Sequence, residues 1–134
     1  MNRETLTKSE REIMDLLWRV ERPLSASEII ELSPTRSWKA SYVHILINSL
    51  IEKEMICPTG LAKTTRNYAR VFIPAVSQTQ YIVRRISDGS KLPVETIVAV
   101  AEDLLNEAED YAAAVTAMKK LLDAKKRALK TDEK

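Results

Sequence analysis

The side chains with the greatest scope for chemistry lie on one predicted helix, within residues 37–56. Apolar residues recur here at intervals of three and four, as on one face of an amphipathic helix: Ala40, Val43, Leu46, Ile47, Leu50 and Ile51. The opposite face carries hydrogen-bonding and methyl-bearing groups: Ser41, His44, Ile45, Asn48 and Glu52, with Tyr42 and Ser49 at its edge. Such groups match the donor, acceptor and methyl pattern that base pairs present in the DNA major groove.

Each residue of this face suits a particular contact. The Asn48 amide can bond adenine through two hydrogen bonds, and Ser41 and Tyr42 can reach base edges or phosphates. Ile45 lies near the middle of the polar face, where a thymine methyl group would explain it; the alternative is an isolated exposed apolar side chain. His44, the only histidine, is either a DNA contact or an ordinary exposed residue. No nucleophile or acid is spaced to form a catalytic group with it, so we predict that the protein is not an enzyme.

A second set of residues suits phosphate contacts, which need no fixed register. It comprises Lys39, Ser49, Lys63, Arg66 and Arg70. Between Ser33 and Ser77, six basic residues stand against two acidic ones, whereas the ten basic and ten acidic residues from Gln78 to Lys134 cancel. The net charge of the whole chain is only +2, so this local imbalance is either a phosphate-binding surface or an uneven distribution of charge.

The elements predicted around these residues have the order of a winged helix-turn-helix. Thr7 with Glu10 and Ser25 with Glu28 form two capping boxes, which predict the starts of two helices. The expected elements are helices over about 8–20, 26–32 and 37–53, a strand over 55–58, a polar loop over 59–67 and a strand over 68–73. Two strands around a basic loop form a wing, and the second helix of the pair is the one that enters the major groove. We therefore predict a mainly α fold with a small β-hairpin wing: a winged helix-turn-helix domain over residues 1–77.

Residues 78–134 are predicted to form a helical dimerisation region. Three amphipathic helices follow Ser77 without a sheet, and roughly 57 residues of helix bury too little apolar surface when they are alone. We expect these helices to pack against a second copy of the chain through one set of side chains: Tyr81, Ile86, Ile97, Val98, Ala101, Leu104, Leu105, Tyr111, Val115, Met118 and Leu122. The alternative is a helical hairpin packed on its own winged domain.

Motifs over Leu6 to Tyr81 resemble the penicillinase-repressor family. The resemblance rests on four segments in order: LTKSEREIMDLLW, LSASEII, SWKASYVHILINSLIEKEMI and YARVFIPAVS. Its most specific points are Trp18 at the end of the first helix, Trp38 at the start of the third, and Pro74 to Ser77 after the wing. The resemblance implies a homodimeric bacterial repressor, with a winged-helix N-terminal domain and a helical C-terminal dimerisation region, that binds a pseudo-palindromic operator.

The departures from the family pattern affect the base-contacting face and the inducing signal. Tyr42 and Ile45 stand where two Thr are usual, and Ser49 stands where Arg is usual, so the resemblance leaves the operator sequence open. Penicillin-responsive members are cleaved at a C-terminal Asn-Phe bond, but the only Phe here is Phe72. Copper-responsive members carry a C-terminal cysteine cluster, and this chain has no Cys after Cys57.

The remaining features narrow the class of protein. Cys57 is the only cysteine, which fits a reducing cytoplasm, and we expect it to be a small core residue. The N-terminus has no apolar run of a signal peptide, and no stretch has the length of a membrane span. The expected partners are double-stranded DNA and a second copy, with no cofactor, metal ion, small-molecule ligand or membrane. The alternative function is a winged-helix protein-interaction module. The low net charge, and Ser49 in place of the Arg that is usual in the family, would favour it.

Overall fold

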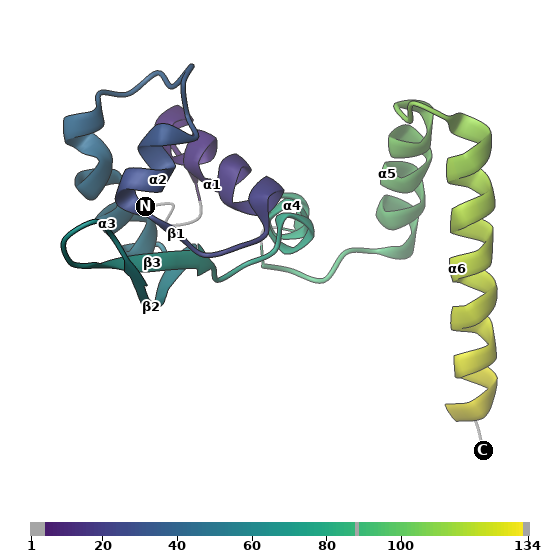
Figure 1. Ribbon diagram of the computed structural model, residues 1–134. Coiled ribbons are helices and arrows are strands. Elements are labelled where there is room, and N and C mark those ends of the chain that lie inside the picture. Colours follow the sequence, from purple (N-terminus) through teal and green to yellow (C-terminus); the bar gives the residue numbers. More distant parts are fainter. Residues whose placement is uncertain (1–4, 88, 133–134) are drawn as a thin grey trace. The chain divides into compact units, whose positions relative to one another are not determined.

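The computed structural model describes residues 5–87 and 89–132. Residues up to 88 form one compact unit and residues from 89 onward form a second. The elements are α1 (Lys8–Val20), β1 (Leu24–Ser25), α2 (Ala26–Glu31), the 3₁₀ helix η1 (Ala40–Tyr42), α3 (Val43–Glu52), β2 (Ile56–Lys63), β3 (Tyr68–Pro74), α4 (Gln78–Ser87), α5 (Val94–Asn106) and α6 (Tyr111–Asp132) (Figure 1).

The first two helices begin where their capping boxes predict. The backbone N–H of Thr7 donates to the Glu10 carboxylate at 2.8 Å, and the N–H of Glu10 donates to the Thr7 hydroxyl at 3.2 Å. Ser25 and Glu28 make the same reciprocal pair at 3.0 and 3.2 Å. Each box satisfies amide groups that have no partner within the helix, so the local sequence alone sets both starting points.

The sheet is larger than the predicted hairpin. It has three antiparallel strands in the order β1–β3–β2, because Leu24 and Ser25 pair with Phe72 and Val71. β2 extends to Lys63 through the predicted loop 59–67, with a β-bulge between Pro58 and Gly60. Gly60 has φ +149°, a conformation that side chains disfavour, and the strand continues past this bulge. The prediction of a loop from residue 59 was therefore wrong over residues 59–63.

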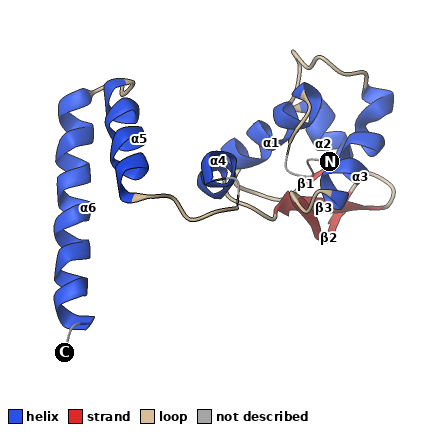
Figure 2. Ribbon diagram, turned by 180° about the vertical axis from the view of Figure 1, so that it is seen from behind, coloured by secondary structure: helices blue, strands red, loops and turns tan. Residues whose placement is uncertain are grey.

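The core of the first unit lies between the helices and the sheet. α1, α2 and α3 cover one face of the strands, which are red in Figure 2. The largest fully buried apolar side chains come from every one of these layers: Ile13, Met14, Leu17, Leu24, Ile29, Ile47, Leu50, Met55 and Ile56. The predicted stripe of the third helix is confirmed at Val43, Ile47 and Leu50, which are buried. This winged-helix architecture confirms the predicted fold class.

The third helix begins later than predicted. Residues 37–39 are not helical; η1 covers residues 40–42, and α3 starts at Val43. Trp38 is buried in the core ahead of η1, and Ser37 donates from its N–H and its hydroxyl to the Glu12 carboxylate of α1, at 3.0 and 2.5 Å. These two anchors fix the chain before the helix, where periodicity predicted a continuous helix from Ser37.

The first unit also extends past the predicted boundary at Ser77. Helix α4 belongs to it, and the division between the units falls between residues 88 and 89. The physical reason is Tyr81, which is only 6% exposed and belongs to the core cluster. Its ring lies 5.7 Å from that of Trp18 on α1, centroid to centroid. Tyr81 is therefore a core residue of the winged domain, which corrects its assignment to the dimerisation surface.

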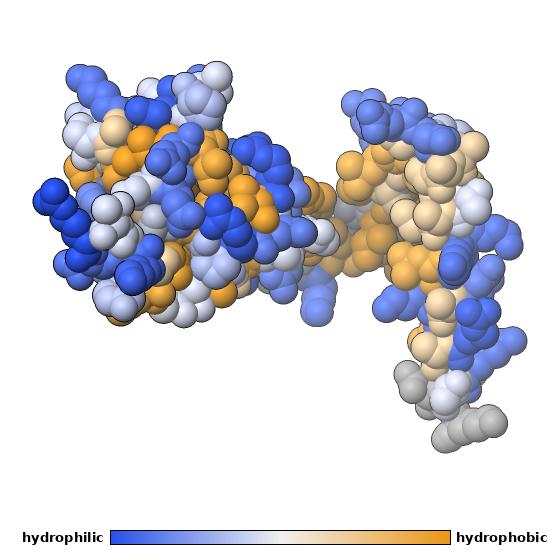
Figure 3. All heavy atoms as spheres, in the orientation of Figure 1, coloured by the Kyte–Doolittle hydropathy of each residue, from blue (hydrophilic) through white to orange (hydrophobic). Residues whose placement is uncertain are grey.

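The second unit consists of α5 and α6. None of residues 89–131 is buried. Figure 3 shows hydrophobic residues gathered along both helices. Within the described part of the chain, no helix has the length and apolar character needed to cross a membrane. A pair of helices with no buried side chain leaves its apolar stripes open to another surface.

Candidate nucleic-acid interface

The predicted base-contacting residues lie together on an exposed face of η1 and α3. Ser41 and Tyr42 belong to η1, and His44, Ile45 and Asn48 belong to α3. All five are exposed, including Ile45, whose side chain is 61% exposed although it is apolar. Because Val43, Ile47 and Leu50 hold the opposite side in the core, the helix presents these five groups outward together.

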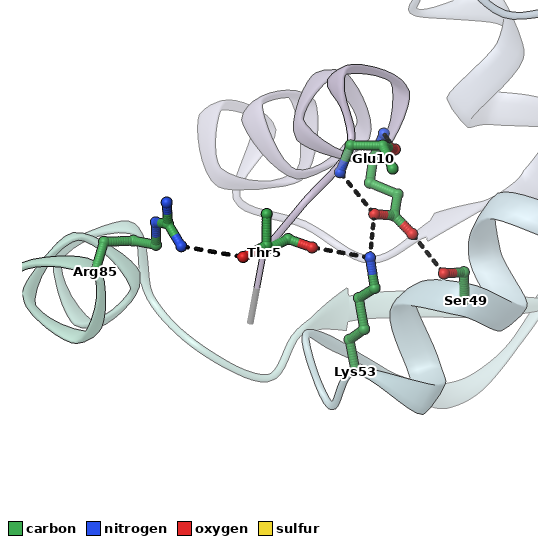
Figure 4. Close-up of polar contacts among 6 residues, drawn as sticks. Thr5, Glu10, Ser49, Lys53 and Arg85 are labelled. Carbon is green, nitrogen blue, oxygen red and sulfur yellow. Dashed lines mark hydrogen bonds and ion pairs between the residues drawn. The ribbon is translucent and has the colours of Figure 1, made fainter. Parts of the chain in front are cut away.

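A buried ion pair fixes the position of α3 on α1. The Glu10 carboxylate, only 2% exposed, lies 2.5 Å from the Lys53 ammonium and also accepts a hydrogen bond from the Ser49 hydroxyl. Lys53 donates in addition to the Thr5 carbonyl at 2.9 Å. Figure 4 shows these groups converging from α1, the end of α3 and the N-terminal segment. The cluster locks the C-terminal end of α3, while the Glu12–Ser37 contact locks the segment that precedes η1.

This geometry removes Ser49 from the predicted phosphate contacts. Its side chain is half-buried and its hydroxyl is bonded to Glu10, away from the exposed face. Burial raises the pKa of Glu10, but hydrogen bonds from Lys53, Ser49 and Thr7 outweigh this effect and hold that pKa below its ordinary value. The carboxylate therefore stays ionised at neutral pH, as a buried charge that is paired and hydrogen-bonded.

The other predicted phosphate contacts are exposed. Lys39 immediately precedes η1, Lys63 ends β2, Arg66 lies in the turn, and Arg70 lies on β3. The hairpin from Ile56 to Pro74 contains three basic residues and no acidic one. The Arg70 guanidinium carbon lies 5.3 Å from the centre of the Phe72 ring. No carboxylate on β2 or β3 would therefore repel a polyanion that approaches this hairpin.

Two apolar residues of the wing share the face of these cations, and sequence reasoning missed both. Leu61 pairs with Arg70 across the hairpin, and Lys63 pairs with Tyr68, so all four side chains lie on one face of the pleat. Leu61 is 65% exposed and Tyr68 is 62% exposed. Their grouping depends on the bulge before Gly60, which shifts the register of β2 and which periodicity alone does not indicate.

The predicted dimerisation residues, Tyr81 apart, are accessible. Five of the large apolar side chains on α5 and α6 are more than half exposed: Ile97, Val98, Leu104, Tyr111 and Leu122. Ile86 on α4 and Val115 on α6 are somewhat less exposed, while Ala101, Leu105 and Met118 are half-buried. A groove between α5 and α6 is lined by Leu105, Val115, Met118 and Leu122.

The described residues hold no other evident chemical centre. No group of three or more His, Cys, Asp or Glu side chains in residues 5–87 and 89–132 is placed to hold a metal ion. Cys57 is a free thiol on β2, half-buried opposite Ile73. The chemistry that the structure presents is therefore the exposed face of η1 and α3 together with the cationic hairpin.

A winged helix-turn-helix with such a face is the architecture of a transcription regulator. The chain belongs to the penicillinase repressor family, whose model matches residues 6–124. This family is one of transcriptional repressors, and the match confirms the resemblance seen in the sequence.

Two further comparisons are with solved structures and with curated proteins. Among solved structures, the chain is similar to the C30AH42A mutant of ZitR from Lactococcus lactis, at 18% sequence identity and a TM-score of 0.40. That similarity covers 93% of this chain and 76% of ZitR. No curated protein matches the chain.

Proposed function

We propose that this repressor acts as a homodimer that binds a pseudo-palindromic DNA operator in a sequence-specific manner. Helix α3, with η1 before it, enters the major groove and contacts base edges through Ser41, Tyr42, His44, Ile45 and Asn48. The observation that carries this proposal is the outward presentation of all five residues on a helix whose other face is held in the core. The repressor bound at its operator would then exclude polymerase from the promoter.

The hairpin supplies the contacts to phosphate. Lys63, Arg66 and Arg70 are exposed on an acid-free hairpin, and Lys39 is exposed immediately before η1. Such contacts set the register of the protein on the duplex and give binding that weakens steeply with salt, without carrying sequence information. Base specificity is therefore assigned to η1 and α3 and general affinity to the wing.

The second unit supplies the dimer contact. Its two helices bury no side chain among residues 89–131 and expose several large apolar ones. Soluble proteins rarely leave such a stripe uncovered, and a second copy supplies a matching stripe by two-fold symmetry. Light scattering should give a mass near 30 kDa, about twice the 15.2 kDa of the chain.

Selection from a random duplex library tests the DNA-binding part of the proposal. The purified protein is incubated with a randomised duplex pool, and bound DNA is amplified over several rounds at moderate salt. We expect enrichment of an inverted repeat whose halves are centred about one helical turn apart, or a multiple of it. Convergence on no sequence, or on a site without two-fold symmetry, would refute binding of a dimer to a pseudo-palindrome.

A further inference from the structure

Helix α4 is fixed to α1 by a cluster that the proposed function leaves unused: Arg11, Trp18 and Tyr81. The planes of the Trp18 and Tyr81 rings are inclined at 39°, with centroids 5.7 Å apart. The Arg11 guanidinium carbon lies 5.8 Å from the centre of the Trp18 ring and 5.4 Å from that of Tyr81. One cation thus faces two aromatic rings, an arrangement that attracts through the ring quadrupoles.

Each member of the cluster is itself held. The Arg11 Nε donates to the Asp15 carboxylate at 2.9 Å, and the Trp18 indole N–H donates to the Val76 carbonyl at 2.9 Å. Tyr81 is buried in the core. The cluster therefore has a defined geometry, which a general apolar contact would not give.

A local cap begins α4, and a long-range contact holds its other end. At its start, Ser77 and Gln80 make a reciprocal cap, with hydrogen bonds of 2.8 and 3.0 Å. Near its end, the Arg85 guanidinium donates to the Thr5 hydroxyl at 3.2 Å, beside the Glu10–Lys53 ion pair (Figure 4). Helix α4 is thus part of the compact winged domain, and it is the last element of that domain before the second unit.

We propose that Arg11, Trp18 and Tyr81 are positioning residues that set how strictly the dimer selects the spacing between its two half-sites. This inference rests on the proposed function. In this dimer, the second units of the two copies contact each other. Helix α4 is the element of the winged domain from which the chain leads into that contact. Residues 89–93, which have no regular secondary structure, then connect the winged domain to the dimer contact. If α4 is released from α1, the chain before Gln78 becomes a second flexible point besides residues 89–93. The two DNA-bound winged domains can then span a wider range of half-site spacings.

The test measures binding against half-site spacing. Duplexes carry two copies of the half-site selected by the wild-type protein, with the centre-to-centre distance changed one base pair at a time. A further duplex carries one half-site. The variants are Arg11→Met and Tyr81→Leu, and Tyr81→Phe is the conservative variant that keeps the ring. Arg19→Met is the matched control, since Arg19 is an exposed arginine on the same helix.

For the wild-type protein, we expect a shift of three base pairs from the best spacing to weaken binding at least about tenfold, because it rotates one half-site about a third of a turn around the duplex. For Arg11→Met and Tyr81→Leu the loss should be less than about threefold, while affinity for the single half-site stays within about twofold of wild type. Tyr81→Phe and Arg19→Met should keep the sharp profile.

Two results would overturn the inference alone. One is a spacing profile as sharp in Arg11→Met and Tyr81→Leu as in the wild-type protein. The other is an equal loss on single and paired half-sites, which would mean that the cluster only supports folding of the winged domain. If the wild-type protein itself binds paired and single half-sites equally, the proposed dimeric function fails, and this inference fails with it.

Discussion

At the scale of single residues, Glu10 connects stability to the position of α3, the proposed base-contacting helix. Its carboxylate bonds Ser49 of α3 and Lys53, which follows α3 directly, and it also caps α1 through Thr7. Removal of one partner from a buried, hydrogen-bonded ion pair leaves the other charge poorly solvated. The Glu10→Gln variant should therefore be less stable at pH 7 by about 2–3 kcal/mol, measured by urea unfolding. The exposed control Glu31→Gln on α2 should change stability by less than about 0.5 kcal/mol.

The contribution of Glu10 should also depend on pH. Its pKa in the folded protein lies below the ordinary value of 4.5. A carboxylate with a lowered pKa stabilises the folded state above its unfolded pKa, and this stabilisation is lost as the pH falls through the folded pKa. The difference in unfolding free energy between wild type and Glu10→Gln should be constant from pH 7 to about 5 and shrink below pH 4.5. A difference that stays constant down to pH 3 would contradict the ionised state of Glu10 in the fold.

Individual residues also show where sequence reasoning stops. The five residues of the proposed base-contacting face could be selected because helical periodicity separates them from the apolar stripe, and the structure places all five in solvent. Ser49 could not be placed correctly, because its partner Glu10 lies 39 residues away in the chain. Periodicity put Ser49 at the edge of the polar face but contains no information about which helix packs beside it.

At the scale of elements, local signals predicted the starts of helices better than the extent of strands. The capping boxes fixed the starts of α1 and α2 because both partners lie within four residues. η1 has no side-chain cap, and its start depends on the burial of Trp38 and on Glu12 of another helix. β1 is only two residues long, and β2 continues through polar sequence because β3 supplies its hydrogen bonds. β1 and β2 therefore form strands because they pair with β3, although their local composition does not favour a strand.

The hairpin as an element should contribute affinity without specificity. Lys63→Ala should weaken binding equally on selected and scrambled duplexes and reduce the slope of log affinity against log salt by about one. Fluorescence anisotropy over a series of salt concentrations measures both quantities. Lys120→Ala, an exposed lysine of α6, is the matched control and should leave the slope unchanged. An unchanged slope in Lys63→Ala would show that this residue contacts no phosphate.

At the scale of the whole molecule, the chain folds as two units, and the boundary lies after α4. The sequence placed it after the wing, because Pro74 and the Ser77 cap mark a break in secondary structure. The end of the wing is not the end of the first unit, because Tyr81 packs α4 into the core of that unit. The exposed apolar stripe of α5 and α6 was predictable in part, because amphipathic helices without a core of their own leave their apolar side chains uncovered.

A charge placed in that stripe should separate the dimer. Ile97→Lys puts a charge on the apolar face of α5, where burial against a second copy would leave it unpaired, so the dimer dissociation constant should rise at least about a hundredfold. Ala99→Lys adds the same side chain two residues along, at a position outside the stripe, and should leave the dimer intact. Sedimentation or light scattering over a range of concentrations distinguishes the two. Dimers of equal strength in both variants would place the interface elsewhere.

The most direct test of the central claim is the ratio of affinities for the selected operator and for a scrambled duplex of the same length, in wild type and in Asn48→Ala. The wild-type ratio should be about 10³ or more, and Asn48→Ala should weaken operator binding by roughly 1–3 kcal/mol with little effect on the scrambled duplex. If Asn48→Ala weakens both duplexes equally, or neither, then the exposed face of η1 and α3 does not contact bases as proposed.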